Sequence, residues 1–156
     1  MQSVRLTIPV VPDRVFAVLA DGWAYASWVV GASHIRDVDA GFPAVGTRIH
    51  HSVGGWPLMV EDVSEVLEME TSRKLVLKVK VWPLFAGIVK VELEPHSGGT
   101  LATMSEEFVA GPGKLLPEPL IAPALNARNK ESLHRLAARA VHDDRYASDG
   151  SQGIQR

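Results

Sequence analysis

Two neighbouring segments of the sequence alternate between apolar and charged residues, and this pattern limits the fold more than any other feature. One segment covers residues 73–82 and the other residues 87–94. Alternation with a period of two places the apolar side chains of a strand on one face. A sheet with one apolar and one charged face is typical of antiparallel sheets whose outer face is wet. In the first segment Leu75, Leu77, Val79 and Val81 oppose Lys78 and Lys80, and in the second Val89, Val91 and Leu93 oppose Lys90, Glu92 and Glu94.

Five further segments have the residue types of strands. Turn residues separate them, among them Gly54-Gly55, Pro83 and Gly98-Gly99. We therefore expect seven strands in all. The five segments are Val4 to Ile8 and residues 33–38, 47–53, 58–69 and 100–109.

Two short helices are expected between the first and second strands. Asp13 stands where a helix N-cap belongs, ahead of RVFAVLA, whose apolar residues have helical spacing. Asp21-Gly22 breaks this helix, and WAYASWV predicts a second one that ends at Gly31.

The last predicted element is a long amphipathic helix over about residues 120–141, with a kink expected near Pro123. We expect residues 1–142 to form one domain and residues 143–156, rich in Asp, Ser, Gly and Gln, to be a disordered tail. The apolar stripe is Ile121, Leu125, Leu133, Leu136 and Ala140, and the opposite face is Arg128, Glu131, Arg135 and Arg139.

Composition excludes several classes of function. The net charge of -2 and the lack of a Lys/Arg block argue against a nucleic-acid partner. No apolar run reaches the length of a membrane span and the N-terminus is unlike a secretory signal, so we expect a cytoplasmic protein without membrane insertion. A chain without cysteine has neither disulfides nor thiolate metal sites. Nucleotide-binding motifs and metal-ligand spacings are missing as well, so we expect no cofactor and no metal; both a monomer and a homodimer stay open.

The order of strand, two short helices, six strands and a long helix resembles the START-related (SRPBCC) superfamily. The resemblance covers about residues 3–141 and is most evident in PDRVFAVLADGWAYASWVVG, GTRIHHSVGGWPL and RNKESLHRLAARA. It is closest to polyketide cyclase/dehydrase and lipid-transport-like members. The resemblance implies an α+β helix-grip fold, a curved seven-stranded antiparallel sheet around the C-terminal helix. It implies no particular reaction, because its members include cyclases, dehydratases, carriers and lipid binders.

A strongly curved sheet cannot close its concave face on itself. One helix laid across that face fills part of the space, and the remainder becomes an apolar cavity. Inward residues of the sheet and of the helix stripe would then select the ligand.

Four polar residues are candidates for this cavity. Ile49 is expected to point inward, and strand alternation then turns His51 inward too. The same argument from Met104 and Phe108 turns Glu106 inward, where His51 and Arg36 are its candidate partners. For His51 the alternative is a wall histidine that only makes a hydrogen bond. For Glu106 it is a carboxylate on the outer face of the sheet or at the mouth of the cavity. Asn129, on the apolar stripe of the helix, would hold either a ligand or a sheet side chain.

Aromatic and methionine side chains are the candidate walls. Flat aromatic surfaces suit planar ligands, although the same residues also serve as ordinary core filler. The predicted ligand-binding set consists of the four polar candidates together with Trp28, Ile49, Trp56, Met59, Trp82, Met104, Phe108 and Leu125.

Three functions are consistent with these residues. The first is binding or carriage of a small hydrophobic, polycyclic or lipid-like ligand, which requires only the cavity. The second is a cyclase or dehydratase in which His51 moves a proton, Glu106 orients it, and Asn129 or Arg36 supports an oxyanion. The third is a partner-binding module whose cavity is incidental. Few convergent polar groups are predicted, so binding ranks first and catalysis second.

Overall fold

The alternating segments form one sheet. The computed structural model describes residues 2–53, 57, 60–81 and 85–147. Among these residues, seven strands follow the predicted segments to within a few residues at each end. The strands are β1 (Gln2–Ile8), β2 (Ala32–Val38), β3 (Arg48–Val53), β4 (Val60–Glu70), β5 (Lys74–Val81), β6 (Phe85–His96) and β7 (Gly99–Ala110).

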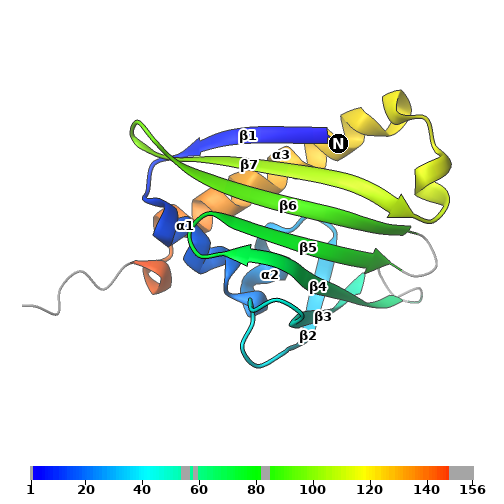
Figure 1. Ribbon diagram of the computed structural model, residues 1–156, viewed down its shortest axis with the longest axis horizontal. Helices are drawn as coiled ribbons and strands as arrows, with labels where there is room; N and C mark the ends of the chain where they lie inside the picture. Colours follow the sequence, from blue (N-terminus) through cyan, green and yellow to red (C-terminus); the bar gives the residue numbers. More distant parts are fainter. Residues whose placement is uncertain (1, 54–56, 58–59, 82–84, 148–156) are drawn as a thin grey trace, which may run out of the picture.

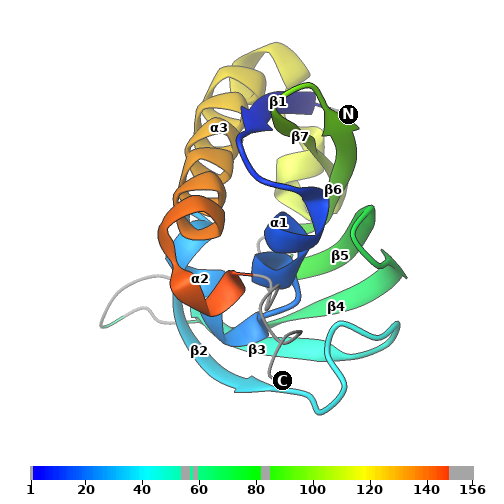
Figure 2. The same ribbon diagram turned by 90° about the vertical axis from the view of Figure 1, so that its left-hand side faces the viewer.

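Every neighbouring pair in the sheet is antiparallel. The strand order is β1-β7-β6-β5-β4-β3-β2, so consecutive hairpins account for all of it except the return of β1 to the side of β7. The sheet curls from β1 and β7 around to β2 and β3, and the long helix α3 (Glu118–His142) crosses its concave face (Figures 1 and 2). This arrangement confirms the predicted α+β helix-grip fold.

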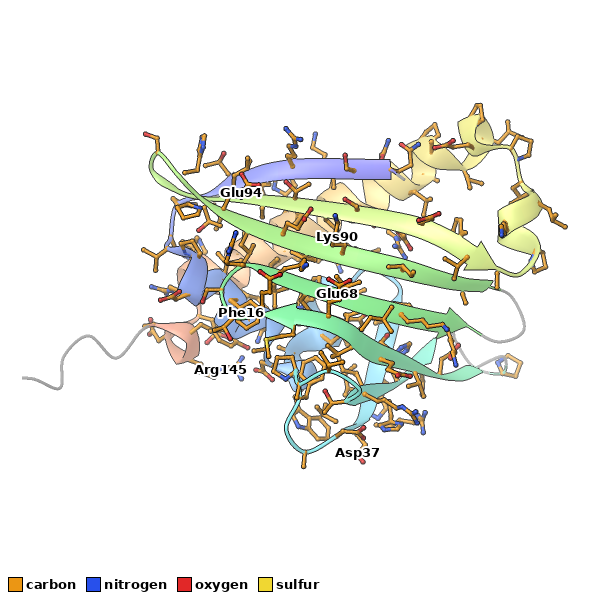
Figure 3. All side chains as sticks on the ribbon, in the orientation of Figure 1. Phe16, Asp37, Glu68, Lys90, Glu94 and Arg145 are labelled. Carbon is orange, nitrogen blue, oxygen red and sulfur yellow. The ribbon has the colours of Figure 1, made fainter. Side chains whose placement is uncertain are left out.

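The two faces of the sheet differ as their alternation predicts. Val89, Val91 and Leu93 of β6 are buried on the concave side. Lys90 and Glu92, between them, form an ion pair of 3.1 Å on the convex side. Figure 3 shows Lys90, Glu94 and Glu68 on the sheet face that is turned away from α3. Apolar burial on one face and charge on the other fix the register of these strands, because a shift by one residue would exchange the faces.

The first helix begins earlier than the sequence predicts. Helix α1 (Pro12–Leu19) has Val11 at its N-cap, without a side-chain hydrogen bond among the described residues. Asp13 is therefore not the cap but lies in the first turn, where a carboxylate is favourable at the positive end of the helix dipole. Pro12 explains the difference, since its fixed φ and missing N–H suit the first helical position.

A short 3-10 helix, η1 (Gly22–Ala24), leads directly into α2 (Tyr25–Trp28). The Asp21 carboxylate caps η1 by accepting a hydrogen bond of 3.3 Å from the Ala24 backbone N–H. The polar break predicted at Asp21-Gly22 is thus a cap. It sets the start of the helix turn that carries Tyr25 and Trp28.

A 3-10 helix η2 (Pro112–Leu115) precedes α3, which continues through Pro123. On the predicted stripe Leu133, Leu136 and Ala140 are fully buried. Within the described residues, no helix is long and apolar enough to cross a lipid bilayer.

The chain stays packed beyond the predicted end of the domain. Asp144–Tyr146 forms a 3-10 helix, η3, and the Tyr146 ring is buried. The Tyr146 hydroxyl donates a hydrogen bond of 2.7 Å to the Asp21 carboxylate. The expected disorder therefore does not begin at Asp143. Residues 148–156 lie outside the described part.

The turn between β6 and β7 requires glycine. Gly98 and Gly99 have φ values of +84° and +147°. A Cβ on Gly99 would lie 2.0 Å from the Ile8 carbonyl oxygen, so the end of β1 passes directly over this turn.

Candidate functional site

A cavity of about 200 Å³ lies between α2, the concave face of the sheet and α3. Its walls are mostly apolar, and the described lining residues come from seven elements (α2, β2, β3, β5, β6, β7 and α3) and one loop. The loop follows α2 directly, so one segment of the chain supplies both the aromatic wall and the neighbouring backbone. The lining consists of Tyr25, Trp28, Val29, Val30, Gly31, Ala32, His51, Leu77, Val79, Val89, Met104, Glu106 and Arg128.

His51 is buried in this wall, as strand alternation predicts. It pairs with Asp62 of β4, and Ile49 pairs with Ser64, so all four side chains lie on the concave face. His51 Nε2 and Ser64 Oγ share a hydrogen bond of 2.9 Å. The Tyr25 hydroxyl lies 3.5 Å from the same Ser64 oxygen.

Aromatic contacts hold this group together. The Tyr25 ring stacks on His51 with centroids 5.9 Å apart and meets Trp28 edge-on at 5.5 Å. Both arrangements are favourable geometries for aromatic rings. Helix α2 and strands β3 and β4 therefore position one cluster of Tyr25, Trp28, His51 and Ser64.

Burial sets the protonation states of the cluster. Desolvation lowers the pKa of His51, against the raising effect of the nearby Asp62 carboxylate, and Arg36 and His50 lower it further. Desolvation likewise raises the pKa of Tyr25. At neutral pH the cluster therefore presents an uncharged imidazole and an uncharged phenol.

Glu106 of β7 is buried at the other side of the cavity, paired with Arg128 of α3. The Glu106 side chain is 3% exposed, whereas that of Arg128 is 30% exposed. Arg128 also donates a hydrogen bond of 3.0 Å to Asn129 Oδ1. The assignment of Arg128 to the outer face of the helix is thus wrong: it starts at the flank of the stripe, and its long side chain reaches inward.

A second hollow of about 210 Å³ adjoins the first at Glu106, which lines both. Gln2 lines it and bridges to α3, since its amide nitrogen donates to Glu118 at 2.5 Å and its amide oxygen accepts from Asn126 at 3.3 Å. This hollow is more polar than the first cavity. Its other lining residues are Glu107, Phe108, Lys114, Leu116, Glu118, Ile121 and Leu125.

The structure divides the predicted ligand-binding residues into five groups. Trp28, His51, Met104 and Glu106 line the first cavity, and Phe108 and Leu125 line the second hollow. Ile49 and Asn129 are fully buried beside these spaces, and Arg36 is exposed on β2, with its guanidinium 3.5 Å from the Asp62 carbonyl oxygen. Trp56, Met59 and Trp82 lie outside the described residues. For all twelve predicted residues, contact with a ligand stays a prediction.

Three side chains of the site were missed from the sequence. Tyr25 belongs to a helix too short to show periodicity, and Arg128 sits at the edge of the apolar stripe. Ser64 could have been found, because it shares strand parity with the apolar Val66 in a segment otherwise rich in acidic residues. In the described residues, no group of three or more His, Asp or Glu side chains is arranged to hold a metal ion.

Comparison with solved structures supports the fold. The chain superposes on protein CV1439 from Chromobacterium violaceum with a TM-score of 0.63 at 18% identity, covering 88% of this chain and 96% of that one. It superposes on Ara h 8.0201 with a TM-score of 0.68 at 15% identity, covering 89% and 95%. The di-domain ARO/CYC StfQ from the steffimycin biosynthetic pathway gives 0.71 at 12% identity, covering 89% of this chain and 49% of that one.

No curated protein matches the sequence. A family model does match, over residues 1–141, which is nearly the whole part that the structure describes. The chain therefore belongs to the family described as polyketide cyclase / dehydrase and lipid transport.

Proposed function

We propose that this protein binds a small apolar molecule in the cavity between α2, the sheet and α3. The observation that carries the proposal is the cavity itself: about 200 Å³ enclosed mainly by valine, leucine, methionine and aromatic side chains. Protein interiors are normally packed without voids larger than a water molecule, so a space of this size in a domain core costs stability unless a ligand uses it.

The volume limits the size of the ligand. An engineered apolar cavity of about 150 Å³ accommodates benzene, so a cavity of this size suits a molecule with on the order of ten non-hydrogen atoms. At roughly −0.6 kcal/mol per atom, such a ligand would bind with about −6 kcal/mol, or a Kd of tens of micromolar. One or two fused rings fit this estimate better than a long lipid chain.

Indane, a bicyclic hydrocarbon of this size, is a suitable probe. In Val79→Phe a larger side chain enters the cavity from β5, and in the matched control Lys80→Phe the same side chain lies on the opposite face of that strand. We expect NMR titration of side-chain methyl groups to show that wild type and Lys80→Phe bind indane and that Val79→Phe does not. Equal binding by both variants, or no binding by wild type, would overturn the proposal.

Acid–base catalysis in the same cavity is the second candidate function. The family description and the structural similarity to the ARO/CYC protein StfQ are reasons to consider it. The observation in its favour is the uncharged, buried His51, which can accept a proton, in a cavity that also holds the Arg128 guanidinium. His51 and Glu106 have different partners, Ser64 and Arg128, so Ser64 is the residue that orients the imidazole.

Native mass spectrometry of the freshly purified protein separates the two candidates when it is combined with a His51→Gln variant. A carrier retains the molecule that co-purifies with the wild type, since His51→Gln leaves the apolar walls in place. An enzyme with this site would instead lose turnover of that molecule in the variant. Turnover by wild type that is abolished in His51→Gln would replace the binding proposal with the catalytic one.

A further inference from the structure

Three residues of the cavity wall each contain a buried nitrogen without a hydrogen-bond partner among the described residues. These atoms are Trp28 Nε1, His51 Nδ1 and Arg128 Nε. Trp28 and His51 are each 98% buried, with 2% of their surface exposed. The buried unpartnered side-chain atoms of the described cavity lining therefore include three nitrogens and no oxygen.

Two of these three atoms can only donate a hydrogen bond, and the third donates in one of its two neutral tautomers. An indole N–H and a guanidinium N–H only donate hydrogen bonds. His51 Nδ1 donates as well whenever Nε2 accepts the hydrogen of the Ser64 hydroxyl, which lies 2.9 Å away. Buried donors without partners are rare in proteins, because burial removes the water molecule that would accept the hydrogen bond and no protein group takes its place. A ligand oxygen that accepts a hydrogen bond would supply the missing partner.

The charges of the cavity wall also limit the charge that a ligand can carry. The carboxylate of Glu106 pairs with the guanidinium of Arg128, so their charges compensate each other. Among the described residues that line the cavity, His51 is the other side chain that can become cationic, and its burial disfavours that charged form. Among the described lining residues, a carboxylate ligand would meet no uncompensated cation, and an uncompensated charge is costly in an apolar cavity.

We infer that the cavity selects a neutral, one- or two-ring carbonyl compound, whose oxygen accepts a hydrogen bond from Trp28 or His51. The inference rests on the proposed function and goes beyond it, because apolar burial alone would favour the plain hydrocarbon. Carbonyl compounds are solvated by water, so without a donor in the cavity a ketone binds more weakly than the hydrocarbon of the same shape. With a donor, this disadvantage disappears.

Three probes with one ring skeleton test this: indane, 1-indanone and indane-1-carboxylate, each titrated into the full chain by NMR. We expect 1-indanone to bind at least as tightly as indane, and the carboxylate at least tenfold more weakly than the ketone. Ketone binding weaker than that of indane, or carboxylate binding as tight as that of the ketone, would overturn the inference. No indane binding at all would instead count against the proposed function.

Variants identify the donor. Trp28→Phe and His51→Phe keep a ring in the wall and remove the N–H, and Trp23→Phe makes the same change at an exposed tryptophan. We expect at least one of the first two to weaken 1-indanone binding about tenfold relative to the indane binding of the same variant, and we expect no change in this ratio in Trp23→Phe. Indane binding also verifies that each variant is folded. Unchanged ketone binding in both wall variants would contradict the assignment.

Discussion

Replacing Arg128 by methionine should destabilise the protein far more than replacing its partner. Breaking a buried ion pair by removing one member costs about 3–5 kcal/mol when the other charge stays buried. The two members differ in this respect, since the Glu106 side chain is 3% exposed and that of Arg128 is 30% exposed. Arg128→Met leaves a carboxylate that cannot reach water, whereas Glu106→Gln leaves a guanidinium that can turn towards solvent.

The magnitudes follow from these exposures. We expect Arg128→Met to lower the free energy of unfolding by about 3 kcal/mol, because the Glu106 charge is stranded and Asn129 loses a donor. Glu106→Gln keeps a hydrogen-bond acceptor for the guanidinium and should cost about 1 kcal/mol. In the double variant no charge is stranded, so its cost should be close to that of Glu106→Gln alone, which gives a coupling energy of about 2–3 kcal/mol.

Urea unfolding at pH 7, followed by far-UV circular dichroism, measures all three variants. Arg135→Met is the matched control, because it makes the same change on the same helix in a solvent-exposed pair with Glu131. It should cost no more than about 0.5 kcal/mol. A cost for Arg128→Met that equals the control, or falls below that of Glu106→Gln, would refute the reasoning from burial.

Three further predictions concern stability. Burial lowers the pKa of His51, so between the two pKa values the unfolded chain binds a proton at this residue and the folded chain does not. The free energy of unfolding should therefore fall as the pH drops below about 6.5. His51→Gln should make this fall smaller in urea titrations between pH 5 and 7. Leu136→Ala removes a fully buried side chain and should cost about 2–5 kcal/mol in the same assay, against less than about 0.5 kcal/mol for Leu120→Ala, where the leucine is 73% exposed. Gly99→Ala places a Cβ against the Ile8 carbonyl and should cost more than about 2 kcal/mol, measured by thermal unfolding, whereas Gly98→Ala has open space and should cost about 1 kcal/mol.

The fold could be predicted because each strand carries its own evidence of which face is buried. In β6 and β7 the alternation of apolar and polar residues is long enough to fix the inward face, and this placed Glu106 correctly on the concave side. His51 followed in the same way from Ile49 in β3. These inferences depend on a period of two within a single strand and need no knowledge of neighbouring elements.

The pairings of these residues could not be predicted, because strand parity shows which side chains point inward but not which of them meet across different elements. Ser64 reaches His51 from across the β3–β4 ladder, and Tyr25 reaches both from a helix of four residues. Arg128 lies at the flank of a helical stripe, a position from which a long side chain can turn either way. The Arg128 side chain turns inward because it pairs with the Glu106 carboxylate, and helical periodicity gives no information about that partner.

The contact between Tyr146 and Asp21 makes the length of the expressed chain a variable in any ligand assay. The match to the family ends at residue 141, and a chain cut there would lack the Tyr146 hydroxyl that donates to Asp21. Asp21 is also the cap of η1, which runs directly into the turn that carries Tyr25 and Trp28. Truncating the chain at residue 141 would therefore disturb the aromatic wall of a cavity whose residues are distant in sequence. A weak affinity measured on such a fragment would be an effect of the truncation and not a property of the full chain.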